Sequence, residues 1–76
     1  MNLSKGEFSR FNLKSKTVLL NENGLILLRK KINEDHEIRL YLIFDFYVEV
    51  FFDMQKNKIQ SAEPLLNNSL LELYFK

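Results

Sequence analysis

The most regular pattern of apolar and polar positions in this chain runs from Ile38 to Asp53. The stretch is rich in β-branched and aromatic residues, which favour strands. As one straight strand, at about 3.3 Å per residue, it would be too long for so small a domain, so it must turn. The break falls at Phe44-Asp45 and predicts two antiparallel strands, Ile38–Ile43 and Phe46–Asp53.

Shorter strands are predicted on both sides of this hairpin. Leu25–Ile32 is the first, with Ile26, Leu28 and Ile32 on one face, and the polar run 33–36 is the turn that follows it. Ile59–Ala62 is a short edge strand, because the proline that follows cannot donate a ladder hydrogen bond. The pattern therefore predicts an antiparallel meander of three to four strands.

The segment before the first strand has two interpretations. Asn12 can cap a helix over Leu13–Asn23, with Gly24 as the left-handed residue after its last turn. Leu13, Thr17 and Leu20 would then share a face. The alternative is a hairpin, since Asn23-Gly24 is a strong signal for a tight turn between Thr17–Leu20 and the following apolar run.

The two ends of the chain complete the predicted architecture. Residues 1–12 are polar, with scattered apolar positions, and no element is predicted there. Ser69 and Glu72 have capping-box spacing, which predicts a short C-terminal helix with Leu70, Leu73 and Tyr74 on its apolar side. We expect a single α+β domain over residues 1–76: an N-terminal helix, the meander and this short helix.

Both faces of the predicted sheet are apolar. A two-residue turn at Phe44-Asp45 pairs Ile43 with Phe46, so that one face carries Tyr41, Ile43, Phe46, Val48, Val50 and Phe52. The opposite face carries Ile38, Leu40, Leu42, Tyr47 and Phe51, with Glu49 and Asp53 among them. A half-exposed antiparallel sheet normally has one polar face. Helices can cover both faces, or an uncovered part can serve as an interaction surface.

The strand sequences also resemble those of a group of proteins. Leu40-Tyr41, then Phe46-Tyr47-Val48-Glu49-Val50, followed by Phe51-Phe52-Asp53, is similar to short uncharacterised bacterial proteins with a helix and a β-meander. The similarity extends from about Asn12 to about Ala62, and it favours the helix for Leu13–Asn23. Those proteins tend to have Asp-Gly in place of Phe44-Asp45 and Trp-Tyr in place of Phe51-Phe52. The resemblance implies no activity.

Composition narrows the setting of this domain. The chain has no cysteine, so disulfides and thiolate zinc sites are excluded, and a reducing compartment fits. Residues 1–11 lack the apolar core of a signal peptide. The longest apolar stretch is interrupted by Arg39, Asp45 and Glu49 and is too short for a membrane span. We expect a cytoplasmic protein without membrane contact.

Candidate chemistry is sparse. His36 is the only histidine, and the acidic residues beside it, Glu34, Asp35 and Glu37, lack the spacing of a calcium loop. Glu49 and Asp53 share a strand face, but no nucleophile or phosphate-binding loop accompanies them. We therefore expect no catalytic residues, metal, cofactor or small-molecule substrate, and no enzymatic activity.

The aromatic sheet supports the first functional hypothesis. Aromatic residues are 13% of the chain and concentrate on the central strands, as they do in interface cores. We expect a non-enzymatic protein-interaction module that self-associates or binds a larger protein. A narrower version is an inhibitor from a phage or mobile element. The residues expected at the interface are Tyr41, Phe46, Tyr47, Phe51 and Phe52.

A basic cluster supports the alternative, a small nucleic-acid-binding protein. Arg29, Lys30 and Lys31 are consecutive, and Arg39 can lie across from them on the next strand, with Tyr41 near enough to stack a base. Lysines at such positions also protect sheet edges from unwanted pairing. The formal net charge is only +1, below that of typical nucleic-acid-binding domains, which favours the first hypothesis.

Overall fold

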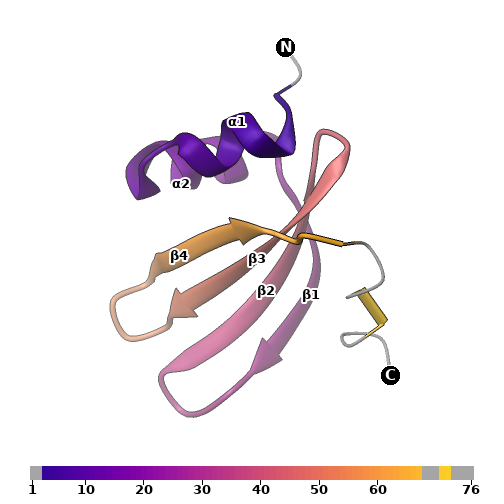
Figure 1. Ribbon diagram of the computed structural model, residues 1–76. Helices are drawn as coiled ribbons and strands as arrows, with labels where there is room; N and C mark the ends of the chain where they lie inside the picture. Colours follow the sequence, from indigo (N-terminus) through magenta and orange to yellow (C-terminus); the bar gives the residue numbers. More distant parts are fainter. Residues whose placement is uncertain (1–2, 68–70, 73–76) are drawn as a thin grey trace.

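The computed structural model has two layers, a four-stranded sheet and two helices on one of its faces (Figure 1). It describes residues 3–67 and 71–72. The strand order matches the chain order, so each strand pairs antiparallel with the next, and the predicted meander is confirmed. The elements are α1 (Lys5–Arg10), α2 (Leu13–Asn23), β1 (Leu25–Lys31), β2 (His36–Ile43), β3 (Phe46–Asp53) and β4 (Lys58–Pro64).

Helix α1 lies in the segment for which the sequence predicted no element. Ser4 and Glu7 form a capping box, in which each side chain accepts a hydrogen bond from the other residue's backbone N–H, at 3.1 and 3.0 Å. So short a helix needs tertiary packing, which the buried Phe8 provides. Lys5 Nζ also donates to the carbonyl oxygens of Leu65 (3.2 Å) and Leu66 (3.4 Å), which ties α1 to the segment after β4.

Helix α2 begins and ends as predicted, and the hairpin alternative is wrong. The Asn12 side chain accepts a hydrogen bond from the Ser15 backbone N–H at 2.8 Å. The prediction that Gly24 is left-handed is wrong. Its backbone is extended, with φ −85° and ψ 148°. Glycine is needed there for space, since a Cβ would lie 2.6 Å from the Leu20 carbonyl oxygen and 2.8 Å from Tyr41 Cδ2.

The face that α2 turns to the sheet also differs from the prediction. Lys16 and Leu20 are buried, whereas Leu13 is 40% exposed. Lys16 can lie inside because its Nζ reaches Glu63 Oε1 at 3.3 Å while its aliphatic stem lines the core. An apolar pattern alone would not place a lysine there.

The central hairpin has the predicted register. Ile43 pairs with Phe46, Tyr41 with Val48 and Arg39 with Val50 across β2 and β3. Phe44 occupies the left-handed region at φ 55°, so the two-residue turn forms without a glycine.

Strand β1 departs from simple alternation. Ile26 pairs with Tyr41 but Leu28 pairs with Leu40, so Leu27 is an extra residue in a β-bulge. Because Tyr41 and Leu40 point to opposite faces, Ile26 and Leu28 do too, and the prediction that they share a face is wrong.

Strand β4 forms the second edge, as predicted, and runs to Pro64. The predicted C-terminal helix falls largely outside the described residues. Of that segment the structure describes Leu71 and Glu72, which have 3₁₀ conformation, and no C-terminal α-helix is present among the described residues.

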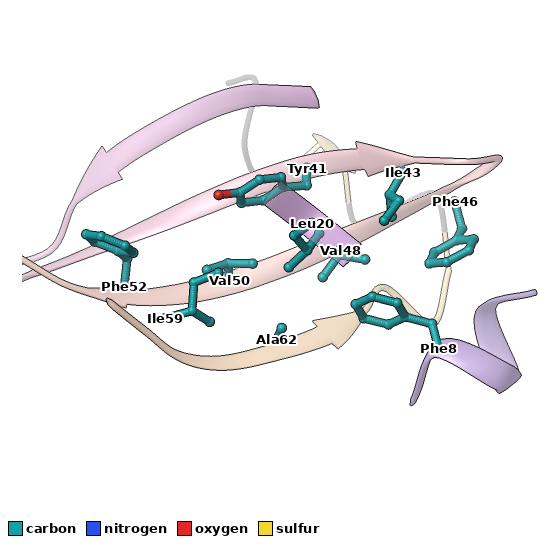
Figure 2. Close-up of a cluster of buried hydrophobic side chains, with 10 residues drawn as sticks. All are labelled: Phe8, Leu20, Tyr41, Ile43, Phe46, Val48, Val50, Phe52, Ile59 and Ala62. Carbon is teal, nitrogen blue, oxygen red and sulfur yellow. The ribbon is translucent and has the colours of Figure 1, made fainter. Parts of the chain in front are cut away.

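The core lies between the sheet and the two helices (Figure 2). Phe8 of α1 contacts Phe46 of β3 edge to face, with ring centroids 5.6 Å apart. The core cluster consists of Phe8, Leu20, Tyr41, Ile43, Phe46, Val48, Val50, Phe52, Ile59 and Ala62.

Among the described residues, neither α1 nor α2 has the length and apolar character that a membrane-spanning helix requires.

Candidate functional site

The five aromatic residues predicted to form an interface are divided between the two sheet faces. Tyr41, Phe46 and Phe52 are buried members of the core cluster drawn in Figure 2. Tyr47 and Phe51 are half-buried on the opposite face. Because the first three are buried and the other two lie on the opposite face, the five do not form one accessible surface.

The helix-free face of the sheet is less exposed than the sequence suggested. Leu40 on this face is fully buried, and Ile38 and Leu42 are half-buried. His36 stacks on Phe51 with ring centroids 5.0 Å apart, which covers part of that ring. Leu25, which pairs with Leu42, is the most exposed apolar side chain of the strands on this face. The exposed large apolar side chains of the described residues are Phe11, Leu13, Val18, Leu25, Ile26, Leu27, Ile32 and Leu66.

Strand β1 concentrates three of these exposed side chains. Leu25, Ile26 and Leu27 are 59%, 41% and 38% exposed. The bulge puts Ile26 and Leu28 on opposite faces, and α2 packs mainly over β4 and β2. β1 is an edge strand, so its outer backbone groups pair with no strand of the described chain (Figure 1). This exposed apolar half of β1, Leu25–Leu28, is called the β1 edge below.

The basic residues of the nucleic-acid hypothesis are also divided. Arg29 and Arg39 are paired across the strands, as predicted, but both donate to the same carboxylate oxygen, Glu37 Oε2. Lys30 pairs with Ile38, so it points to the face opposite to theirs. Lys31 is paired with Glu37 in the register of the strands. The four cations therefore do not all lie on one face, and two of them share the Glu37 carboxylate.

Glu37 is the centre of an ionic cluster at the sheet surface. Burial disfavours its charged form, but the hydrogen bonds from Arg39 and Arg29 outweigh this and hold the pKa of Glu37 below its ordinary value. The Arg39 guanidinium also lies 3.5 Å from the centroid of the Phe52 ring, a cation–π contact. Burial by itself would lower the pKa of Arg39. The hydrogen bonds with Glu37 and Tyr41 outweigh burial, so the pKa of Arg39 lies above its ordinary value. This geometry holds both guanidinium groups against one carboxylate and ties β1 to β2.

Asp53 and His36 have structural partners. Asp53 Oδ1 accepts from the backbone N–H groups of Gln55 and Lys56, both at 3.0 Å, which shapes the β3–β4 turn. The Lys56 N–H contributes most to holding the pKa of Asp53 below its ordinary value, and burial opposes it. His36 Nδ1 lies 3.2 Å from Asn33 Oδ1. Within residues 3–67 and 71–72, no three metal-ligating side chains gather.

A groove lies between α2 and the β3–β4 turn. It has a volume of about 630 Å³ and is lined by Leu13, Lys14, Thr17, Val18, Lys56, Lys58, Ile59 and Gln60. We call it the α2 groove. A smaller cavity of about 320 Å³ continues from it and shares Thr17, Lys58 and Ile59 with it.

Sequence reasoning missed both the β1 edge and the α2 groove. The run Leu25–Leu28 is apolar at four consecutive positions, a pattern typical of a strand buried on both faces, so the sequence alone did not indicate exposure. The groove had no sequence signal either. Lys14 and Lys58 are distant in the sequence, and the fold alone brings them to one cavity.

Comparisons with models of protein families, with curated proteins and with solved structures found no match to this chain. The fold and the two surfaces are therefore the basis for a functional assignment.

Proposed function

We propose that this domain is a non-enzymatic protein-interaction module that pairs its β1 edge with another chain. The observation that carries the proposal is the exposure of Leu25, Ile26 and Leu27 on a strand whose outer backbone is unpaired among the described residues. Strand addition to such an edge satisfies backbone groups and buries apolar side chains together.

The charges along β1 indicate which half is open to pairing. Lysines protect sheet edges, because burying them against a second strand is costly. Lys30 and Lys31 protect the C-terminal half of β1 in this way, whereas Leu25–Leu28 has no charged residue. The unprotected half is the part that a partner strand would cover.

A second copy of the chain has the chemistry that fits this strand. In antiparallel pairing about a two-fold axis, Leu25 of one copy faces Leu28 of the other, and the apolar halves cover each other. The basic ends then point away from each other, so they do not repel. The basic end of each copy then lies near the C-terminal end of α2 of the other copy. That last turn contains Glu22 and no basic residue.

The test is the mass in solution, by size-exclusion chromatography with light scattering at low and high salt. We expect a dimer that persists at high salt, because apolar burial and backbone pairing are not screened. Ile26→Lys should yield a monomer with an unchanged circular dichroism spectrum. Val18→Lys is the matched control, since Val18 is similarly exposed (46% against 41%) but lies on α2, and it should remain a dimer.

A wild-type monomer at high protein concentration would refute pairing with a second copy. Pairing of the β1 edge with a different protein would then be tested by capturing binding partners from a lysate of the native host with the same two variants. A protein retained by Val18→Lys and lost with Ile26→Lys would support the β1 edge. Equal capture by both variants, or no capture, would overturn it.

A further inference from the structure

We infer that the α2 groove binds an acidic peptide segment of another protein that also carries apolar side chains. This site is separate from the β1 edge, and the inference does not depend on the proposed pairing of β1.

The floor of the groove is aliphatic. Ile59 of β4 is 6% exposed at its base, and Leu13 and Val18 of α2 form one wall at 40% and 46% exposed. Most side chains so exposed on a helix are polar, whereas these two expose apolar surface to water. Apolar side chains of a ligand would cover them.

The rim of the groove is positively charged. Lys14 stands on the helix wall, and Lys56 and Lys58 stand on the opposite wall, from the β3–β4 turn and the start of β4. None of the described lining residues is acidic. The nearby Asp53 carboxylate is buried, and its oxygens accept from backbone N–H groups of the turn and from Gln60 Nε2 at 3.2 Å. A ligand with carboxylates on either side of an apolar contact would match this distribution of charge.

The shape favours an extended chain over a compact molecule. The groove is open to solvent and continues into the smaller cavity, which reaches Asn21 on α2. From Leu13 to Asn21 the helix axis rises by about 12 Å, at about 1.5 Å per residue. An elongated segment can lie along this length, with each carboxylate near one of the lysines.

Single-stranded nucleic acid fits the groove less well, although it is also anionic. Proteins that bind it combine cationic grooves with aromatic rings on which bases stack. The aromatic residues next to the groove, Tyr41 and Phe52, are 4% and 8% exposed, and Arg39 covers the Phe52 ring. The accessible floor is aliphatic, which suits leucine or isoleucine side chains.

The experiment measures fluorescence anisotropy of a labelled decapeptide that alternates pairs of glutamates with single leucines. Three further probes are the same peptide with serine for leucine, the same peptide with glutamine for glutamate, and a single-stranded oligonucleotide of equal charge. We expect the first peptide to bind at least about ten-fold more tightly than each of the others, since apolar and charged contacts each contribute.

Variants locate the binding. Lys14→Glu with Lys58→Glu should weaken binding of the first peptide by about ten-fold or more, and Val18→Ser should weaken it less. Lys30→Glu is the control, since it changes the net charge on β1 away from the groove and should leave the affinity unchanged. Ile26→Lys should also bind as the wild type does, which separates this site from the β1 edge.

Three results would overturn the inference. The first is no binding of the acidic leucine peptide. The second is equal binding of the serine peptide or the oligonucleotide, which would indicate general attraction of polyanions. The third is an equal loss of affinity in Lys30→Glu and in the groove variant.

Discussion

Replacing Gly24 by alanine tests the close packing of α2 against the sheet. A Cβ at this position would lie 2.6 Å from the Leu20 carbonyl oxygen and 2.8 Å from Tyr41 Cδ2. Neither atom can move easily. The carbonyl accepts the hydrogen bond from the Gly24 N–H that ends the helix, at 2.9 Å, and the Tyr41 ring is buried in the core.

The expected magnitude is the difference between two effects. Gly24 has an extended backbone that alanine adopts without strain, so the loss of freedom in the unfolded chain would stabilise the protein by about 0.4–1 kcal/mol. Overpacking against a fixed backbone atom and a buried ring costs about 1–3 kcal/mol. We therefore expect Gly24→Ala to lower the free energy of unfolding by about 1–2 kcal/mol.

Gly6→Ala is the matched control, and its effect should have the opposite sign. A Cβ at Gly6 would meet only Ser4 Oγ, at 4.0 Å, and the residue lies in α1, where alanine is favoured over glycine. We expect this variant to be more stable than the wild type by about 0.5 kcal/mol.

The assay is urea unfolding followed by far-ultraviolet circular dichroism, with thermal unfolding as a second measure. For a domain of 76 residues, 1 kcal/mol corresponds to about 4–8 °C in the unfolding midpoint. A Gly24→Ala variant as stable as the wild type, or more stable, would refute the packing argument. A decrease in both alanine variants would show that the effect is not specific to the contact with Tyr41.

Three further outcomes follow from the ionic cluster and the turns. Glu37→Gln should lower the free energy of unfolding by about 1–3 kcal/mol in urea titrations, because it leaves the largely buried Arg39 guanidinium without an ionised partner. The pKa values of Glu37 and Asp53 are lowered in the folded protein, so the unfolded chain takes up protons first. The stabilisation by these two carboxylates is complete above their ordinary pKa values of about 4. It declines as the pH falls through those values toward the lower pKa values of the folded protein. Urea midpoints measured against pH should show this decline, and Glu37→Gln should make it shallower. Asn57 lies at φ 55° in the β3–β4 turn, so Asn57→Ala should cost about 1 kcal/mol in the same assay while Asn57→Gly costs little.

The parts of the fold that local rules decide were predictable from the sequence. Asn12 caps α2 through its own side chain, and the break at Phe44-Asp45 sets the whole register of β2 and β3. Each of these signals acts on residues within three positions of it in the sequence. The bulge at Leu27 was not predictable, because it depends on how β1 follows the twist of the sheet and not on its own residues.

The accessibility of the residues predicted at an interface depends on tertiary packing, which local sequence patterns do not specify. An aromatic-rich strand pattern does not reveal that both N-terminal helices cover the same face, which buries Phe46 beneath Phe8. A basic run does not reveal that Arg29 and Arg39 both pair with the Glu37 carboxylate. Exposure of Ile26, on the face of the sheet that carries the helices, follows from the position of α2 over β4 and β2.

The hydrogen bonds from Lys5 to the segment after β4 join residues about sixty positions apart. The hairpins of the meander close short loops, whereas this contact closes nearly the whole chain and has the highest entropic cost of closure. Hydrogen exchange in the native state should therefore find that α1 opens before the sheet does, in a subglobal unfolding of lower free energy. In that open form the ring of Phe46 loses its contact with Phe8, so the core aromatic surface becomes transiently accessible from the side that α1 covers.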